Sequence, residues 1–163
     1  MNKVFFDLEW NTGFLDGNSF DEIIEIGAVK TDEEYRQIDG FRRLIRPVIY
    51  RKMNPYIQKI LAITMKDLQG EEPLAAVAKV FFDWCGDCDT LIAWSGNDFG
   101  VLEKNLAHIG MKIPEQLGRY DVQMAYAYRT ENSIRNYALK TAVEAMELPE
   151  PEGQEYHDAY CDA

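Results

Sequence analysis

The chain has 163 residues, of which 47% are hydrophobic and 12% aromatic, and its formal net charge is −11. This length and composition predict a single globular domain and exclude a disordered chain. Acids interrupt the apolar residues at the N-terminus, and no apolar run reaches the length of a membrane span. We therefore expect no signal peptide and no membrane contact. The odd count of three cysteines further favours a reducing, cytoplasmic location.

The hydrophobic pattern predicts strands first and helices later. Buried strands are expected over residues 3–9 and 23–29, with Gly13, Gly17 and Asn18 marking the turn between them. Further strands are expected over 37–46, 91–94 and 118–121. Helices are expected over 55–62, 73–85, 122–129 and 134–146. Ser133 is expected to cap the last of these, and one more helix is expected from Asn97 or Asp98 to Gly110. This order predicts an α/β fold, a mixed five-stranded sheet flanked by helices.

Two acids lie inside the first predicted strand. Asp7 and Glu9 are separated by one residue, and positions i and i+2 of a strand point to the same face. Two neighbouring carboxylates on one face of a buried strand are costly unless something neutralises them. A divalent cation is the natural partner, and ligands that are all oxygen favour Mg²⁺ or Mn²⁺ over zinc.

The excess of acids is unusual for a protein that binds nucleic acid. A protein that grips only a few terminal nucleotides nevertheless needs few phosphate contacts, and bound metal ions add positive charge. Basic side chains gather between residues 36 and 52, namely Arg36, Arg42, Arg43, Arg46, Arg51 and Lys52. They fit either a charged edge strand that resists aggregation or a surface for a nucleic-acid backbone.

Three motifs carry a resemblance to a known family. They are Phe6–Glu9, Trp94–Asp98 and His157–Asp162, and the segments Glu22–Val29 and Ile63–Leu68 support them. With these motifs in order along essentially the whole chain, the sequence resembles the DnaQ-like, DEDDh family of 3′→5′ exonucleases. Members of this family have a ribonuclease H-like fold. Four residues separate the histidine and the aspartate of the third motif, as in the DEDDh branch.

The resemblance implies a complete catalytic site. Asp7, Glu9, Asp98 and Asp162 are expected to hold two Mg²⁺ or Mn²⁺ ions about 4 Å apart. His157 is expected to act as the general base, because imidazole titrates near neutral pH. The implied substrates are the 3′ ends of single-stranded DNA or RNA, and the implied products are nucleoside 5′-monophosphates. The sequence does not indicate a protein or polymerase partner.

The contacts to the substrate are harder to predict. Trp10 and Asn11 stand where the family commonly has small or hydroxyl residues, and the second motif lacks a frequent His-Asn lead-in. We expect Trp10, Asn11 and Thr64 to contact the nucleic acid. Glycines 13 and 17 are expected to let a loop after the first motif approach the 3′ end.

The last motif ends close to the C-terminus of the chain. We expect one exonuclease domain over residues 1–163, cut just after the third motif, where a helix would normally continue. A short helical turn is marginal without length or packing. His157 and Asp162 are therefore expected to turn away from the other acids until metal or nucleotide binds.

The sequence leaves three alternatives to a nuclease. Cys85 and Cys88 resemble a thioredoxin motif, but they follow a helical pattern instead of preceding one, so nothing there lowers a thiol pKa. A zinc site made from these cysteines with His157 and Cys161 would need ligands far apart in the sequence. A non-catalytic nucleic-acid-binding scaffold is disfavoured because no member of the catalytic set is missing.

Overall fold

A computed structural model of the chain describes residues 1–61, 63–131, 136–148 and 157–163. Its strands are β1 (Lys3–Leu15), β2 (Asn18–Thr31), β3 (Gln37–Leu44), β4 (Thr90–Ala93) and β5 (Gly118–Asp121). Its helices are α1 (Ile57–Ile60), α2 (Met65–Leu68), α3 (Leu74–Cys85), α4 (Gly96–His108), α5 (Val122–Glu131), α6 (Leu139–Ala145) and α7 (Ala159–Asp162).

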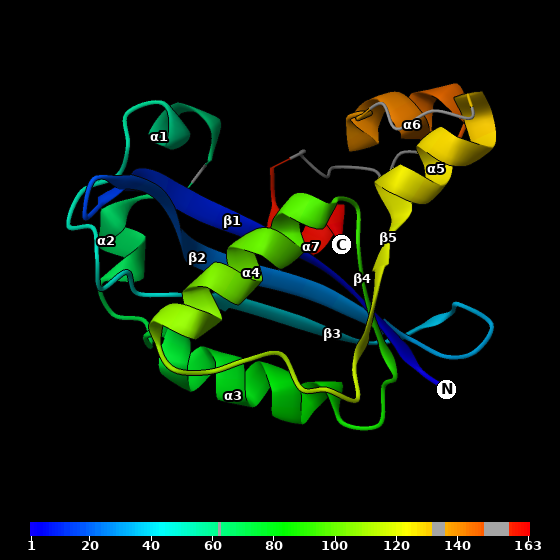
Figure 1. Cartoon of the computed structure of the whole chain (residues 1–163), viewed down its shortest axis with the longest axis horizontal. Coiled ribbons are helices and arrows are strands. Elements are labelled where there is room, and N and C mark those ends of the chain that lie inside the picture. The colour runs from blue at the N-terminus through cyan, green and yellow to red at the C-terminus, as the bar shows by residue number, and fades with distance from the viewer. Residues whose placement is uncertain (62, 132–135, 149–156) are drawn as a thin grey trace.

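The strands form one sheet in the order β3-β2-β1-β4-β5 (Figure 1). The pairs β1–β2 and β2–β3 are antiparallel, whereas β1–β4 and β4–β5 are parallel. The predicted mixed five-stranded sheet is therefore confirmed. The basic segment supplies β3, which is an edge strand.

The first two strands are longer than predicted and form one extended hairpin. The turn lies at Asp16 and Gly17, which both have positive φ angles, 50° and 81°. An Asp-Gly pair is typical of such tight hairpin turns. The prediction of a loop at Gly13 after the first motif is wrong, because Gly13 lies within β1 and pairs with Phe20. A Cβ at Gly13 would lie 2.6 Å from the ring of Tyr50, so glycine admits this ring against the strand.

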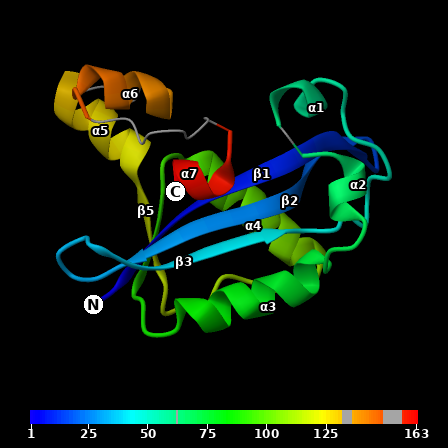
Figure 2. The same ribbon diagram turned by 180° about the vertical axis from the view of Figure 1, so that it is seen from behind.

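Helices cover both faces of the sheet. On one face, Val4, Phe6 and Leu8 of β1 belong to the main core, to which α3 and α4 contribute their apolar sides. Helix α4 crosses in front of the sheet in Figure 1 and lies behind it in Figure 2. Since side chains alternate along a strand, Asp7 and Glu9 point away from this core. Residues 22–28 of β2 are all buried, as expected for a central strand covered on both sides.

A β-bulge interrupts the hairpin beside the first motif. Glu9 pairs with Glu25, but the next residue, Trp10, pairs with Ile23, so Ile24 is extra. A bulge of this kind redirects the side chains that follow it. Ile24 is fully buried in a second, smaller core with Met53, Leu61 and Leu68. The extra residue of the bulge therefore packs β2, the strand next to the acids, against the segment that contains α1 and α2.

Two predicted helix starts differ from the structure. Ser95 is the N-cap of α4, where it accepts a hydrogen bond from the Asn97 N–H at 3.2 Å, so the prediction of Asn97 or Asp98 was wrong. Serine ranks among the best capping residues, and it leaves Asp98 in the first turn. Helix α6 begins only at Leu139, with Ala138 as N-cap, and the predicted cap Ser133 lies outside the described residues. None of the helices described is long and apolar enough to cross a membrane.

Candidate metal centre and active site

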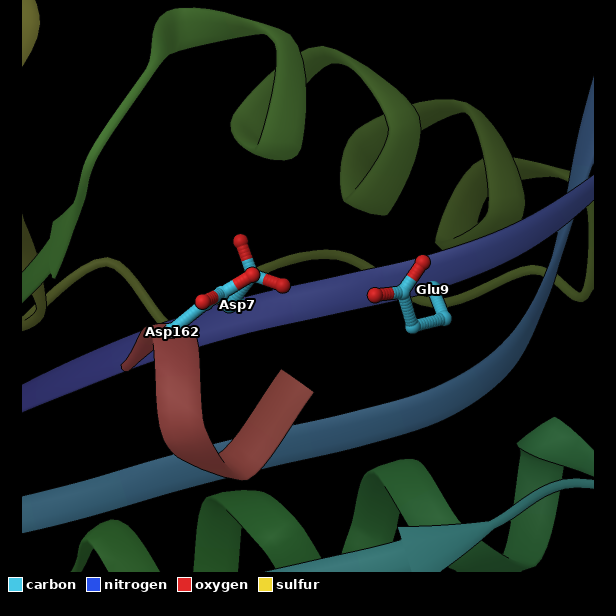
Figure 3. Close-up of side chains that lie close together, drawn as sticks. All are labelled: Asp7, Glu9 and Asp162. Atoms are coloured by element: carbon cyan, nitrogen blue, oxygen red, sulfur yellow. The ribbon is translucent and has the colours of Figure 1, made fainter. Parts of the chain in front are cut away.

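Three of the predicted ligands lie together on the face of the sheet opposite the main core. Asp7 and Glu9 extend from β1, and Asp162 extends from the end of α7 (Figure 3). One carboxylate oxygen from each residue lies within 4.8 Å of the others. The sequence positions 7 and 162 are thus brought into one site, and all its donor atoms are oxygens.

The site strongly disfavours its own negative charge. Burial, followed by the charges of Asp98, Glu9 and Asp162, raises the pKa of Asp7 to about 9. Burial, followed by the charges of Glu25 and Asp162, raises the pKa of Glu9 to about 8. Carboxylates that hold their protons so tightly are poised for a cation that can replace those protons. The residues therefore fit a hard divalent metal ion.

Asp98 lies beside this group, in the first turn of α4. It is buried, and its charge is the largest charge that raises the pKa of Asp7. The hydroxyl of Ser95 donates to Asp98 Oδ2 at 3.1 Å and so orients the carboxylate. Burial raises the pKa of Asp98 to about 6, although hydrogen bonds from Ser95 and nearby backbone groups oppose the increase. Asp98 can thus ionise more readily than Asp7.

Helix α7 is held in place despite its length of four residues. Asp158 is its N-cap and accepts hydrogen bonds from the Tyr160 and Cys161 N–H groups. A Cβ at Gly27 of β2 would lie 2.1 Å from the Ala159 carbonyl carbon, so the helix backbone rests directly on this glycine. The prediction that Asp162 turns away from the other acids is wrong, because packing against the sheet replaces the stability that a longer helix would supply.

His157 immediately precedes this helix. Its backbone N–H donates to Asp162 Oδ2 at 3.0 Å, and its side chain is exposed. Its φ angle of 70° lies in the left-handed region, which is uncommon for a residue other than glycine. The backbone of the proposed base is thus fixed to a proposed metal ligand while the imidazole remains accessible to solvent.

Two residues next to the site were not predicted from the sequence. Glu25 of β2 is fully buried and lies directly opposite Glu9 in the strand register. Arg42 of β3 pairs with Glu25 and also with Asp158. Glu25 is an acid within the apolar run from Ile23 to Val29, which is the same kind of sequence signal as Asp7 in the first strand.

The three predicted substrate contacts have other roles in the fold. Trp10 packs against the main core. Asn11 is buried, donates to the Lys52 carbonyl and accepts from the Asn54 N–H, so it ties β1 to the following loop. Thr64 caps α2 in a capping box with Asp67. Of the three, Thr64 is the most exposed, and substrate contact by these residues stays a prediction.

The cysteine pair does not form a reactive site. Cys85 and Cys88 are buried and unlinked, at and just beyond the C-terminal end of α3. Burial raises the pKa of Cys85 to about 12, which disfavours the thiolate that redox chemistry needs. Neither cysteine belongs to the Asp7, Glu9 and Asp162 cluster found in the described part of the chain.

Comparisons with known proteins bear on this arrangement. A family model described as an exonuclease, RNase T, matches residues 4–163. DNA polymerase III PolC-type of Clostridium perfringens (strain 13 / Type A) is 34% identical over 112 residues, which are 68% of this chain and 7% of the polymerase.

Solved structures share the fold over nearly the whole chain. A 3′-exonuclease that recognises the 3′ end of a histone mRNA stem-loop has a TM-score of 0.81 at 15% identity, covering 99% of this chain and 59% of that one. E. coli Exonuclease I in complex with a dT13 oligonucleotide has a TM-score of 0.73 at 17% identity, covering 99% of this chain and 38% of that one. At these identities the likeness concerns the fold, and this chain spans less than two thirds of either protein.

Proposed function

This chain belongs to the RNase T exonuclease family, and we propose that it removes nucleotides one at a time from the 3′ end of single-stranded nucleic acid. The family match confirms the exonuclease class and the resemblance that the three motifs indicated. The observation that carries the proposal is the convergence of Asp7, Glu9 and Asp162 within 4.8 Å, with buried Asp98 beside them.

In this proposal four carboxylates form the metal site. Asp7, Glu9, Asp98 and Asp162 would hold two divalent ions, and their oxygen donors favour Mg²⁺ or Mn²⁺. Such ions supply Lewis acidity and positive charge at the scissile phosphate when bound. The raised pKa values of Asp7 and Glu9 support this assignment, because the site is unfavourable for two free carboxylates.

His157 would serve as the general base. It would take one proton from the attacking water as the new P–O bond forms. The bond between phosphorus and the 3′-oxygen then breaks and this oxygen takes a proton from solvent water, leaving a shortened chain with a 3′-hydroxyl and a nucleoside 5′-monophosphate. Two observations support this role: the backbone N–H of His157 donates to the proposed metal ligand Asp162, and the His157 side chain is exposed to solvent.

The proposed substrates include both DNA and RNA. The solved structures with this fold include one protein that recognises an RNA 3′ end and one in complex with a DNA oligonucleotide. We therefore include both DNA and RNA 3′ ends. The five strands of the described residues form one sheet, which supports a single exonuclease domain. The free cysteines fit the proposed cytoplasmic location.

The test is digestion of matched single-stranded DNA and RNA oligonucleotides labelled at the 5′ end. With Mg²⁺ or Mn²⁺ we expect labelled products that shorten stepwise and unlabelled 5′-monophosphates, and with chelator we expect neither. Asp7→Asn serves as the control that lacks one ligand. Early release of a labelled mononucleotide would reverse the proposed polarity. Intact oligonucleotides under every condition would favour the non-catalytic scaffold.

A further inference from the structure

Arg42 lies at the junction between the sheet and the third motif. Its Nε donates to Glu25 Oε1 of β2 at 2.7 Å, and its Nη2 donates to Asp158 Oδ2 at 2.6 Å. In the strand register Arg42 also lies opposite Gly27, the residue on which α7 rests. One guanidinium therefore connects two separate carboxylates across the surface that receives α7.

The two carboxylate oxygens of Asp158 accept hydrogen bonds from different groups. Oδ1 accepts from the Tyr160 and Cys161 N–H groups at 3.1 and 3.2 Å and so caps α7, whereas Oδ2 accepts from Arg42. Fixing Oδ2 fixes the plane of the carboxylate and hence the direction in which the capped helix starts. Asp162 lies at the other end of this single helical turn.

Glu25 anchors the other side of the arginine. Its side chain is only 1% exposed, whereas that of Arg42 is 49% exposed. A buried carboxylate that loses its cation is left uncompensated, which is strongly unfavourable. Because Glu25 lies opposite Glu9 in the sheet, any rearrangement of Glu25 would occur beside a proposed metal ligand.

We propose that Arg42 is a positioning residue of the metal centre: by bridging Glu25 and Asp158, it holds α7 so that Asp162 meets Asp7 and Glu9. The inference rests on the proposed function of that site, but it concerns the geometry of the ligands. Arg42 itself touches neither the metal nor the substrate in this role. A planar guanidinium suits a bridge between two carboxylates better than the single ammonium of lysine.

A different role for Arg42 would have a different signature. An exposed arginine near an active site can also contact a phosphate of the nucleic acid. Losing a phosphate contact raises KM and makes the salt dependence shallower by about one unit of slope, without changing metal affinity. Losing a positioning contact instead weakens metal binding and lowers kcat while leaving KM nearly unchanged.

The experiment compares Arg42→Met with Arg119→Met. Arg119 pairs with Glu103 at the surface, and its side chain is 47% exposed, so it is a matched control for exposure and for loss of an ion pair. Mn²⁺ binding is measured by calorimetry without nucleic acid, and kcat and KM are measured on the labelled oligonucleotide. For Arg42→Met we expect Mn²⁺ affinity to fall by about 10–100-fold, the usual effect of losing a residue that orients metal ligands. In that variant kcat falls and KM stays within about twofold of wild type.

Further variants of Arg42 and its partner Asp158 test the same contact. Arg42→Lys is expected to recover part of the Mn²⁺ affinity, and Arg119→Met to bind Mn²⁺ as the wild type does. If Arg42→Met does not fold, Asp158→Asn replaces it, since the amide still offers an oxygen to cap α7 but loses the charge that pairs with Arg42. Asp158→Asn should also bind Mn²⁺ more weakly than the wild type.

Each outcome separates this inference from the nuclease proposal. Wild-type Mn²⁺ affinity in Arg42→Met, or in Asp158→Asn where that variant replaces it, overturns the positioning role, whatever the oligonucleotide assay shows. Unchanged Mn²⁺ affinity with a raised KM identifies a phosphate contact and also overturns it. If Arg42→Met binds Mn²⁺ more weakly but the wild-type protein releases no nucleotides, the positioning role stands and the exonuclease proposal is wrong.

Discussion

At the scale of single residues, Asp7 has the most strongly raised pKa of the four proposed metal ligands. Burial is the first cause of its raised pKa, and the charges of four neighbouring acids add to it. Glu9 is affected in the same way, with Glu25 as the largest neighbouring charge. Folding therefore brings together groups that the chain would keep apart if it were optimised for stability alone. Such a concentration of strain is typical of functional sites.

The first prediction concerns stability against pH in the presence of chelator. The pKa values of Asp7 and Glu9 are raised to about 9 and about 8 in the folded protein, from ordinary values of 3.8 and 4.5. The folded state then binds protons more tightly than the unfolded state, so this stabilisation is fully present below the ordinary values. It is lost as pH rises toward the folded values. We expect the Tm in chelator to fall steadily between pH 5 and pH 9.

Asp7→Asn and Mn²⁺ provide the controls for this prediction. The amide is neutral in the folded and unfolded states, so folding of the variant at pH 8 does not require residue 7 to take up a proton. In chelator its Tm should therefore be higher than that of the wild type by at least about 2–4 °C, which corresponds to about 1 kcal/mol at this size. Adding Mn²⁺ should raise the Tm of the wild type at pH 8 more than that of the variant. A wild-type Tm in chelator that rises between pH 5 and pH 9 would contradict the assigned shifts.

The second prediction concerns His157. His157→Ala should lower kcat by about 10²–10⁴-fold, the range expected for loss of a general base. Mn²⁺ affinity should change little, because Asp162 accepts its hydrogen bond from the backbone N–H of residue 157, which alanine retains. Full activity in the variant would exclude His157 from the mechanism.

At the scale of elements, α7 shows why the chain end could not be predicted from its own sequence. The residues from 157 to 163 contain a good cap, Asp158, but only one helical turn. The groups that hold the turn, Gly27 and Arg42, lie more than a hundred positions earlier. A local pattern reports nucleation and capping, whereas this helix depends on long-range packing.

The third prediction tests that packing. Gly27→Ala places a Cβ 2.1 Å from the Ala159 backbone, so α7 must shift. A displacement of about 1 Å at a catalytic group can cost about 10²-fold in rate, and we expect a loss of that order in kcat with a cooperative unfolding transition retained. Gly70→Ala is the matched control, because nothing lies within 4 Å of its added Cβ and it should keep wild-type kcat. Equal activity of the two variants would show that α7 tolerates displacement.

At the scale of the whole molecule, the order of elements was predictable where hydrophobic pattern and turn residues agreed. The strand over 118–121 matches β5, and the first motif lies in a strand as expected. The hairpin length was not predictable, because glycine is a common turn residue, whereas Gly13 pairs with Phe20 within β1 and leaves room for the ring of Tyr50 from a distant loop. The bulge at Ile24 likewise depends on pairing between strands, which periodicity does not report.

The position of the basic residues favours one of the two roles predicted for residues 36–52. They form and follow an edge strand, and several of them have partners within the chain: Arg36 pairs with Asp32 and Glu34, Arg42 with Glu25 and Asp158, and Arg46 donates to the Glu71 carbonyl. Cations that are engaged in this way contribute less to an extended phosphate-binding surface. Together with the net charge of −11, this favours a protein that grips few phosphates.

The last prediction follows from that charge distribution. Each phosphate neutralised on a single strand contributes about −0.7 to the slope of log affinity against log salt, so a grip on about three phosphates gives about −2. We expect log(kcat/KM) against log[KCl], at constant Mn²⁺, to have a slope no steeper than about −2 for a single-stranded oligonucleotide. The double variant Arg46→Gln/Arg51→Gln should change this slope by less than about one unit, because neither residue is expected to hold a phosphate. A slope steeper than about −5 that becomes shallower in the double variant would instead assign the basic segment to the nucleic-acid backbone, and the edge-strand interpretation would then be wrong.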